Sequence, residues 1–340
     1  MKPSIFKNCW FLVLSLLIIH IQATYAQTIQ YTNPIAEQRA DPCIYRDADG
    51  TYYFIATAPE FDRIEIRSAK TINGLKGATA KVIWRKHGSG PMGSHIWAPE
   101  LHKIKGVWYI YFAAGGAENE TQWDIRMFAL SNKSANPLDG KWAEEGRIMT
   151  KMDSFSLDAT TFEYKGKQFY VWAQKTPEQK SGSSLFIAEM ASPTQLKEQQ
   201  VLICKPTYAW ETVVYEVNEG PAVIRRNGKI FITYSASNTD YNYAMGMLWA
   251  DENANLLDPA SWHKSDKPVF FTNEAAKRFG PGHNSFTVAE DGKTDLMVYH
   301  ARNYKEIKGH PLGDPNRHTR VRLLHWTKDG FPDFRQEEGD

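Results

Sequence analysis

Hydrophobic and polar residues alternate over short runs along most of this chain, and the apolar spacing of amphipathic helices is nearly absent. The short runs are rich in Val, Ile, Tyr, Phe and Trp and are separated by turns with Gly, Asn or Asp, which predicts β-strands. Five strands stand out, because each follows a glycine-containing turn that itself follows another short strand. Their sequences are TYYFIATA, VWYIYFAA, QFYVWAQ, KIFITYSAS and TDLMVYHAR.

The five predicted hairpins recur at a nearly constant spacing. They begin at Asp41, Ala98, Asp158, Glu219 and His283, so that successive starts lie 57, 60, 61 and 64 residues apart. A repeat of this length, with room for two more strands after each hairpin, is typical of a β-propeller. A two-sheet sandwich is the alternative, but it would not place equivalent residues at equal spacing. We therefore predict an all-β, five-bladed β-propeller, with the tail 320–330 helping to complete the last blade.

The first 26 residues have the pattern of a secretory signal peptide. Lys2 and Lys7 are followed by an apolar run from Trp10 to Ile21, and Ala26 is a small residue at the expected cleavage point. The apolar run is shorter than the roughly 20 residues that a membrane span needs. We expect residues 27–340 to form one propeller domain that is exported, either to a periplasm or outside the cell, without membrane attachment after cleavage.

The composition of the chain indicates which kinds of molecule the protein is able to bind. The 40 basic and 39 acidic residues give a net charge of +1, which provides no electrostatic footprint for nucleic acid. After cleavage only Cys43 and Cys204 remain, too few for a disulfide framework, and no zinc-type spacing is present. Aromatic residues make up 13% of the chain, with 11 tryptophans, which suits carbohydrate partners as well as a β-rich core.

The residues that open the five units point to chemistry. The first strand of each propeller blade lines the channel, so Asp41, Asp158, Glu219 and His283 are expected to converge on one small volume. A core built for stability avoids this, because clustered carboxylates repel one another and lose solvation. We expect Gly220-Pro221 to hold Glu219 at the start of its strand on an extended backbone. Paired carboxyl groups, one protonated and one ionised, are the equipment of glycosidic bond hydrolysis, although a single one would more often be a cap or turn residue.

With these motifs the chain resembles the family 43 glycoside hydrolases from about Tyr31 to Phe334. The matching stretches are RADPCIYRDADGTYYF, SLDATTF, NEGP, HIWAPELH and GPGHNSF. The resemblance implies that Asp41 is the general base, Glu219 the general acid, and Asp158 the residue that tunes the pKa of the acid. The family is inverting, which implies that base and acid stand about 6.5–9.5 Å apart with a water between them.

Five further residues are candidates for the site. Trp97 and Phe61 are expected to stack on substrate, with core packing as the alternative. Arg320 and His318, in the stretch RHTR, are expected to reach substrate hydroxyls or the acid, with a surface-loop cluster as the alternative. His283 is similar to the family's channel histidine, which implies either a neighbouring calcium or other ion, or a metal-free hydrogen-bonding histidine. The resemblance implies no required cofactor.

Within the family the chain looks most like exo-acting α-L-arabinofuranosidases, which implies plant cell-wall arabinan or arabino-oligosaccharides as substrate. Insertions around 59–63 and 302–318 are expected to close one end of the groove and so select a chain terminus. From the end near residue 340 we expect the extra C-terminal sandwich common in the β-xylosidase branch to be missing. The alternatives are a β-xylosidase or an endo-arabinanase on the same fold, or a non-catalytic glycan-binding propeller.

Overall fold

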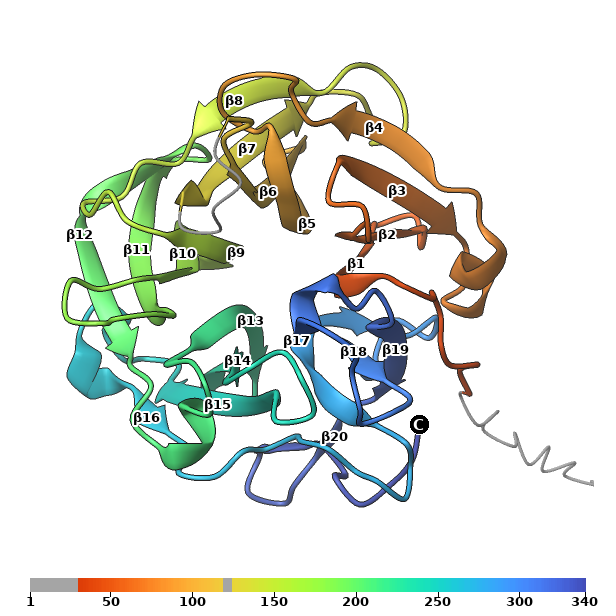
Figure 1. The fold of residues 1–340 in the computed structure, drawn as a ribbon, viewed down its shortest axis with the longest axis vertical. Helices are drawn as coiled ribbons and strands as arrows, with labels where there is room; N and C mark the ends of the chain where they lie inside the picture. Colours follow the sequence, from red (N-terminus) through yellow and green to blue (C-terminus); the bar gives the residue numbers. More distant parts are fainter. Residues whose placement is uncertain (1–29, 119–123) are drawn as a thin grey trace, which may run out of the picture. The chain divides into compact units, whose positions relative to one another are not determined.

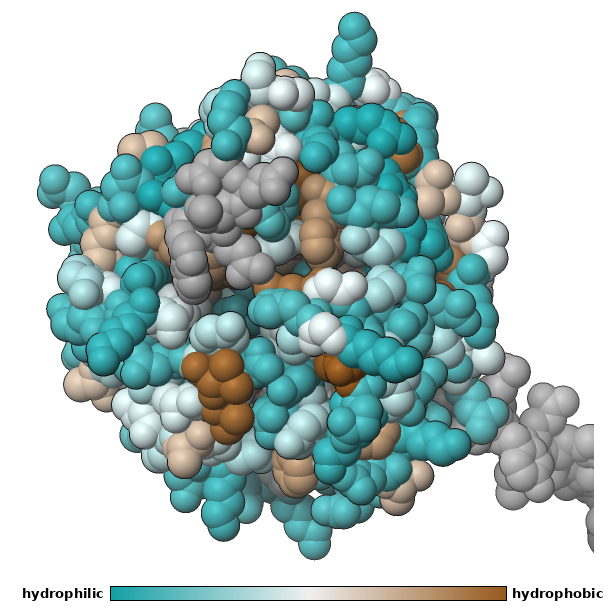
Figure 2. All heavy atoms as spheres, viewed as in Figure 1, coloured by the Kyte–Doolittle hydropathy of each residue, from teal (hydrophilic) through white to brown (hydrophobic). Residues whose placement is uncertain are grey.

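Five antiparallel sheets surround a central channel in the computed structural model, which describes residues 30–118 and 124–340 (Figure 1). The predicted five-bladed β-propeller is confirmed, and Tyr31–Asp340 form one compact unit. The predicted signal peptide lies outside the described residues. In the part of the chain that is described, no helix has the length and apolarity required to cross a bilayer. The face drawn in Figure 2 is mostly hydrophilic, with small hydrophobic patches.

Each blade is built from consecutive strands, with the first innermost. Blade 1 contains β1 (Ala40–Arg46), β2 (Tyr52–Thr57), β3 (Arg63–Ala69) and β4 (Lys81–Arg85). Blade 2 contains β5 (Ser94–Ile104), β6 (Val107–Gly115), β7 (Arg126–Asn132) and β8 (Ala143–Arg147). Blade 3 contains β9 (Ser156–Tyr164), β10 (Lys167–Gln174), β11 (Ser184–Ser192) and β12 (Gln195–Cys204).

The last two blades follow the same plan with shorter outer strands. Blade 4 contains β13 (Asn218–Arg226), β14 (Lys229–Ala236), β15 (Ala244–Asp251) and β16 (His263–Lys264). Blade 5 contains β17 (Phe279–Val288), β18 (Asp295–Arg302) and β19 (His318–Leu323), and the pair β20 (His325–Trp326) and β21 (Pro332–Asp333) follows it. The short 3-10 helices are η1 (Asn73–Gly77), η3 (Ala209–Glu211), η4 (Pro259–Ser261) and η5 (Pro311–Gly313).

The N-terminal segment closes the ring against the last blade. The amide of Thr319 in β19 donates to the carbonyl of Ala36 at 2.9 Å, and the amide of Ile35 donates to the carbonyl of Thr319 at 2.9 Å. The tail was predicted to help complete the last blade over residues 320–330, and β19, which pairs with β18, does so. The contribution of residues 35–36 to this blade was not predicted. This pairing covers an edge that would otherwise expose unpaired backbone groups.

Every innermost strand carries a β-bulge at the same level, where two of its residues face one residue of the second strand. The first bulge residue has positive φ in all five blades: Asp41 (54°), Ala98 (44°), Asp158 (53°), Gly220 (54°) and His283 (44°). The bulge residue of blade 4 is therefore Gly220, and Glu219 precedes it by one position. The expected equivalence of Glu219 with Asp41 was therefore wrong by one residue, whereas Glu219 itself pairs with Ser235 as part of the strand.

A glycine is required at this position of blade 4 for two reasons. Its φ of 54° lies in the left-handed region, which side-chain-bearing residues rarely adopt. A Cβ atom at Gly220 would also meet Cγ of the His283 ring at 3.0 Å. The acidic side chain of this blade consequently comes from the preceding residue, Glu219.

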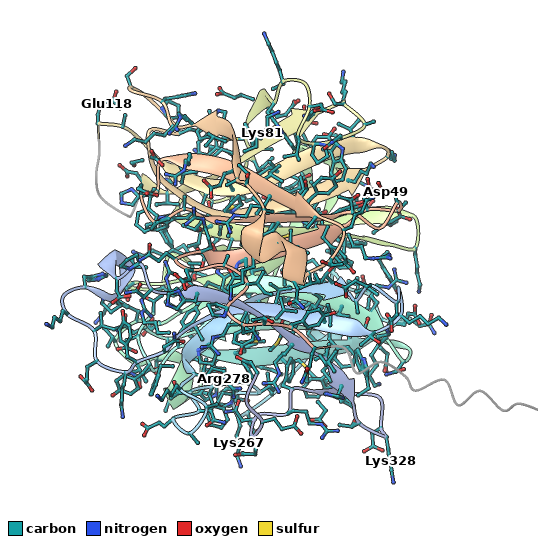
Figure 3. The ribbon with its side chains drawn as sticks, turned by 90° about the vertical axis from the view of Figure 1, so that its right-hand side faces the viewer. Asp49, Lys81, Glu118, Lys267, Arg278 and Lys328 are labelled. Atoms are coloured by element: carbon teal, nitrogen blue, oxygen red, sulfur yellow. The ribbon has the colours of Figure 1, made fainter. Side chains whose placement is uncertain are left out.

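Aromatic side chains fill the spaces between neighbouring sheets. Trp108, Trp172, Tyr111 and Tyr170 are completely buried, so much of the aromatic content serves the core. Charged side chains such as Lys267 and Lys328 lie at the periphery of the molecule (Figure 3). The two remaining cysteines are buried free thiols, so no disulfide joins them.

Candidate active site

A cavity of roughly 880 Å³, open mouth included, lies where the innermost strands converge. Its floor holds charged and imidazole side chains from β1, β9, β13 and β17, and its walls come from the connecting segments. The structure thus brings the three predicted carboxylates to one cavity. The lining residues are Asp41, Trp97, Phe155, Leu157, Asp158, Gly182, Ser183, Tyr215, Val217, Glu219, Ser237, Asn238, Thr239, His283, His310, Leu312 and Arg317.

Asp41 is held as a carboxylate by a dense set of donors. Thr57 Oγ1 donates to its Oδ2 at 2.6 Å, and Arg317 Nη1 donates to its Oδ1 at 3.3 Å. His283 Nδ1 lies 3.2 Å from the same Oδ1. Burial alone would raise the pKa of Asp41, but His283, Arg317 and His300 together hold that pKa well below its usual range. Asp41 is therefore ionised at neutral pH.

Two histidines, His283 and His300, lie beside the Asp41 carboxylate. His300 Nδ1 accepts the backbone N–H of Asp41 at 3.0 Å, which leaves the ring proton on Nε2. His283 Nδ1 lies between two carboxylates, 3.2 Å from Asp41 Oδ1 and 3.7 Å from Asp158 Oδ2. Burial lowers the pKa of both histidines, so at neutral pH Arg317 supplies the formal positive charge beside Asp41.

The other two carboxyl groups favour the protonated state. Glu219 is partly open to the cavity, and Tyr243 Oη donates to its Oε1 at 2.7 Å. Burial, with the charge of Asp41, raises the pKa of Glu219 to about 7 against the opposing effects of Tyr243 and Arg317. Asp158 Oδ2 accepts the amide of Gly220 at 3.1 Å. Burial and the charges of Glu219 and Asp41 raise the pKa of Asp158 well above its usual range.

The predicted aromatic residues lie at different depths. Trp97 lines the cavity, and its ring makes edge contacts with Phe61 at 5.6 Å and with His95 at 4.9 Å. Phe61 does not line this cavity and packs behind Trp97, beside a smaller adjoining cavity that also touches Leu312 and Arg317. Phe61 is thus placed to support Trp97 rather than to touch a molecule in the main cavity.

Arg320 and His318 are not brought to the cavity. His318 Nδ1 accepts the backbone amide of Gln38 at 3.1 Å. Arg320 Nη1 bonds Asp340 Oδ2 at 2.7 Å within a buried cluster that also contains Arg278 (labelled in Figure 3) and Arg322. Residues 318, 320 and 322 share one face of β19 because side chains alternate along a strand. The expectation that Arg320 and His318 reach the acid is thus replaced by a role in the outer packing of blade 5.

Three residues that face the carboxylates were missed. Arg317 immediately precedes β19, three residues before Arg320, and the alternation of side chains along an extended backbone was the available signal that the two face opposite ways. Tyr243 immediately precedes β15 and His300 lies within β18. Neither of these two is marked by any local motif, because their importance arises from contacts across blades.

The described residues contain no group of three or more His, Cys, Asp or Glu side chains arranged to hold a metal ion. Calcium prefers about six to eight oxygen ligands, whereas His283 offers one imidazole nitrogen that already faces Asp41. The side chains at His283 therefore do not fit a directly ligated calcium.

An ionised carboxylate and a protonated carboxyl group that face one cavity are the arrangement used for acid–base cleavage of glycosidic bonds. The chain belongs to the glycosyl hydrolases family 43, whose pattern matches residues 31–332. The relatives and a solved structure agree with this membership.

An extracellular exo-α-(1→5)-L-arabinofuranosidase of Streptomyces avermitilis is 55% identical over 93% of this chain, and the chain spans 65% of that relative's length. A protein of the same description from Streptomyces chartreusis is 53% identical over 83% of this chain and 85% of its own. The crystal structure of an α-L-arabinofuranosidase from Lactobacillus brevis is 55% identical with a TM-score of 0.87, covering 89% of this chain and 96% of the other.

Proposed function

We propose that this protein is an inverting exo-α-L-arabinofuranosidase that releases arabinose from α-1,5-linked arabinan or arabino-oligosaccharides. Asp41 is the general base, Glu219 the general acid, and Asp158 the residue that tunes the acid. One observation carries the proposal: the pKa values of two carboxyl groups in the same cavity shift in opposite directions. The pKa of Asp41 is lowered, and the pKa of Glu219 is raised to about 7. Pairs of carboxyl groups with separated pKa values are how glycosidases divide the two roles.

The reaction follows from these protonation states. Asp41 takes a proton from a water molecule as the water oxygen attacks the anomeric carbon. Glu219 gives its proton to the glycosidic oxygen as the bond between carbon and that oxygen breaks. The water attacks the face opposite to the leaving group, so the configuration at the anomeric carbon inverts. A final proton exchange with solvent restores ionised Asp41 and protonated Glu219.

Asp158 acts on the acid from the buried side. Its carboxyl group accepts the amide of Gly220, the residue that follows Glu219, and thereby ties the backbone of the acid to blade 3. The charge of Glu219 raises the pKa of Asp158, so the two carboxyl groups titrate together. Ionisation of Asp158 would in turn disfavour ionisation of Glu219, which is how it would tune the acid.

Removal of single terminal residues is supported by one wall of the cavity. His310 and Leu312, in the segment that joins β18 to β19, line the cavity together with Arg317. The loop that carries Phe61 packs behind Trp97 and adjoins Leu312. These two connections coincide with the insertions at 59–63 and 302–318, and a wall there favours a chain terminus. The activities by which the similar proteins are described support the same substrate.

Product analysis on linear α-1,5-arabino-oligosaccharides tests the proposal. The expected first product is monomeric arabinose, and proton NMR during the first turnovers should show the β-anomer. Oligomeric products would indicate an endo-arabinanase, and the α-anomer would contradict inversion. Turnover of a β-xyloside in place of the arabinoside would indicate a β-xylosidase. Binding without hydrolysis would indicate a non-catalytic propeller.

We further propose that residues 1–26 direct export and that plant cell-wall arabinan is the natural partner. The two Streptomyces relatives are described as extracellular, which supports export of this chain. Mass spectrometry of protein from the periplasm and from the medium tests this, with Gln27 as the expected first residue.

A further inference from the structure

Tyr243 and His300 form a stacked pair that touches both proposed catalytic carboxyl groups. Tyr243 Oη donates to Glu219 Oε1 at 2.7 Å. The Tyr243 ring lies nearly parallel to the His300 ring, with 5.7 Å between centroids and 6° between planes. At the other end, His300 Nδ1 accepts the Asp41 amide at 3.0 Å and lies 3.5 Å from Asp41 Oδ1. One continuous series of contacts therefore joins the acid in blade 4 to the base in blade 1.

The surroundings leave this pair little freedom to move. Tyr243 is 1% exposed and His300 is completely buried. Gly282, which precedes the bulge of blade 5, has no space for a side chain, because a Cβ there would lie 2.5 Å from Tyr243 Cε1. Gly282 is the blade 5 counterpart of Glu219, so the tyrosine ring occupies the place that a side chain of that blade would take.

We propose that Tyr243 and His300 are positioning residues whose stacked rings hold the acid and the base at a fixed separation. The inference rests on the proposed roles of Glu219 and Asp41. An inverting glycosidase needs that separation, because the attacking water must fit between base and sugar. A shift of about 1 Å in such a site can reduce the rate by roughly 100-fold.

The two members of the pair act on different steps. Tyr243 contacts only the acid, so its hydroxyl orients the proton that the leaving oxygen receives. His300 contacts only the base, and its ring nitrogen accepts the Asp41 amide, so it fixes the backbone that carries the Asp41 carboxylate. A residue that served only the core would affect both steps together, through loss of folded protein.

The substitution Tyr243→Phe removes the hydroxyl and keeps the ring. We expect kcat for arabinotriose, whose leaving group needs a proton, to fall about 10- to 100-fold, within the range of general acid catalysis. With 4-nitrophenyl α-L-arabinofuranoside, whose leaving group needs little protonation, kcat should change less than about 3-fold. The alkaline limb of kcat/KM should move to higher pH, because Glu219 loses a hydrogen bond that favours its ionised form. The substitution leaves the other charged or titratable groups of the cavity around Glu219 unchanged, namely Asp41, Asp158, His283 and Arg317.

The substitution His300→Phe keeps the stack and removes the acceptor of the Asp41 amide. We expect both substrates to lose activity by a similar factor, because water activation is needed for either leaving group. Tyr299→Phe is the matched control, since Tyr299 is a buried neighbour in β18 whose hydroxyl bonds Asp340 rather than the site. It should leave the ratio of the two rates unchanged. Thermal unfolding of each variant reports whether it folds.

The outcomes separate this inference from the proposed function. A parent protein that hydrolyses no glycoside overturns both. An active parent with an unchanged substrate ratio and an unmoved alkaline limb in Tyr243→Phe overturns the positioning role alone. If Tyr243→Phe does not fold, the His300→Phe variant tests the inference instead. Unequal losses of activity on the two substrates in His300→Phe would contradict the positioning role.

Discussion

Replacement of Glu219 by glutamine is the most direct test of the acid, because it removes the proton donor and keeps the size of the side chain. With a pKa of about 7, roughly half of the Glu219 side chains carry a proton at pH 7. A carboxyl group at the ordinary value of 4.5 would be less than about 1% protonated at that pH. Burial in this cavity therefore raises the population of the acid form by about 100-fold.

General acid catalysis is typically worth about 100- to 10,000-fold, or about 3–5 kcal/mol of barrier. We expect kcat for arabino-oligosaccharides to fall in Glu219→Gln by that factor. Substrate affinity should persist, because Tyr243 can still donate to the amide oxygen and Trp97 is untouched. The assay is initial-rate kinetics at pH 6 to 7 with arabinotriose and with the 4-nitrophenyl arabinoside, together with calorimetric binding of arabinotriose to the variant.

The activated substrate should retain much more activity than the oligosaccharide, since its leaving group needs no proton. Glu216→Gln is a suitable control, because Glu216 is an exposed carboxylate nearby in the sequence that does not line the cavity. Equal losses on both substrates, or a variant that turns over arabinotriose at the parental rate, would refute the assignment of Glu219 as the acid.

Other predictions concern the base, the pH profile and the fold. Asp41→Asn should lose activity equally on both substrates, since the missing group is the base, and initial-rate kinetics measure this. The plot of kcat/KM against pH should fall above about pH 7 as Glu219 ionises, and should have no acidic limb near pH 4, because the pKa of Asp41 is lowered. Gly220→Ala should lower both Tm and kcat, because it strains a left-handed residue and displaces the adjacent imidazole. Asp340→Ala should reduce the free energy of unfolding by about 3–5 kcal/mol, measured in urea, with kcat unchanged, because it leaves the buried Arg320 cluster without its carboxylate.

The parts of this structure that could be predicted from the sequence are those with a local or periodic cause. Alternating strands and glycine turns revealed the hairpins, and their spacing indicated five blades. The convergence of Asp41 and Asp158 followed from that repeat.

The errors have non-local causes. The one-residue offset at Glu219 depends on which residue takes the left-handed conformation, and that depends on the His283 ring beside Gly220. Arg317 immediately precedes β19 and faces the cavity, whereas Arg320 lies within β19 and faces the cluster around Asp340. Tyr243 and His300 contact the carboxylates through packing between blades, which no local pattern of residues reports.

The offset in blade 4 explains how a repeated scaffold produces two unlike carboxyl groups. Asp41 and Asp158 occupy the bulge position itself, and aspartate is among the non-glycine residues that tolerate positive φ. Glu219 starts one residue earlier, which displaces its backbone by about 3.3 Å along the strand, and its side chain is one methylene longer. Its carboxyl group therefore accepts a hydrogen bond from Tyr243, whereas that of Asp41 accepts hydrogen bonds from Thr57 and Arg317. The glycine at the bulge of blade 4 thus gives Glu219 a position and a hydrogen-bond partner that differ from those of Asp41, and the pKa values of the two carboxyl groups shift in opposite directions.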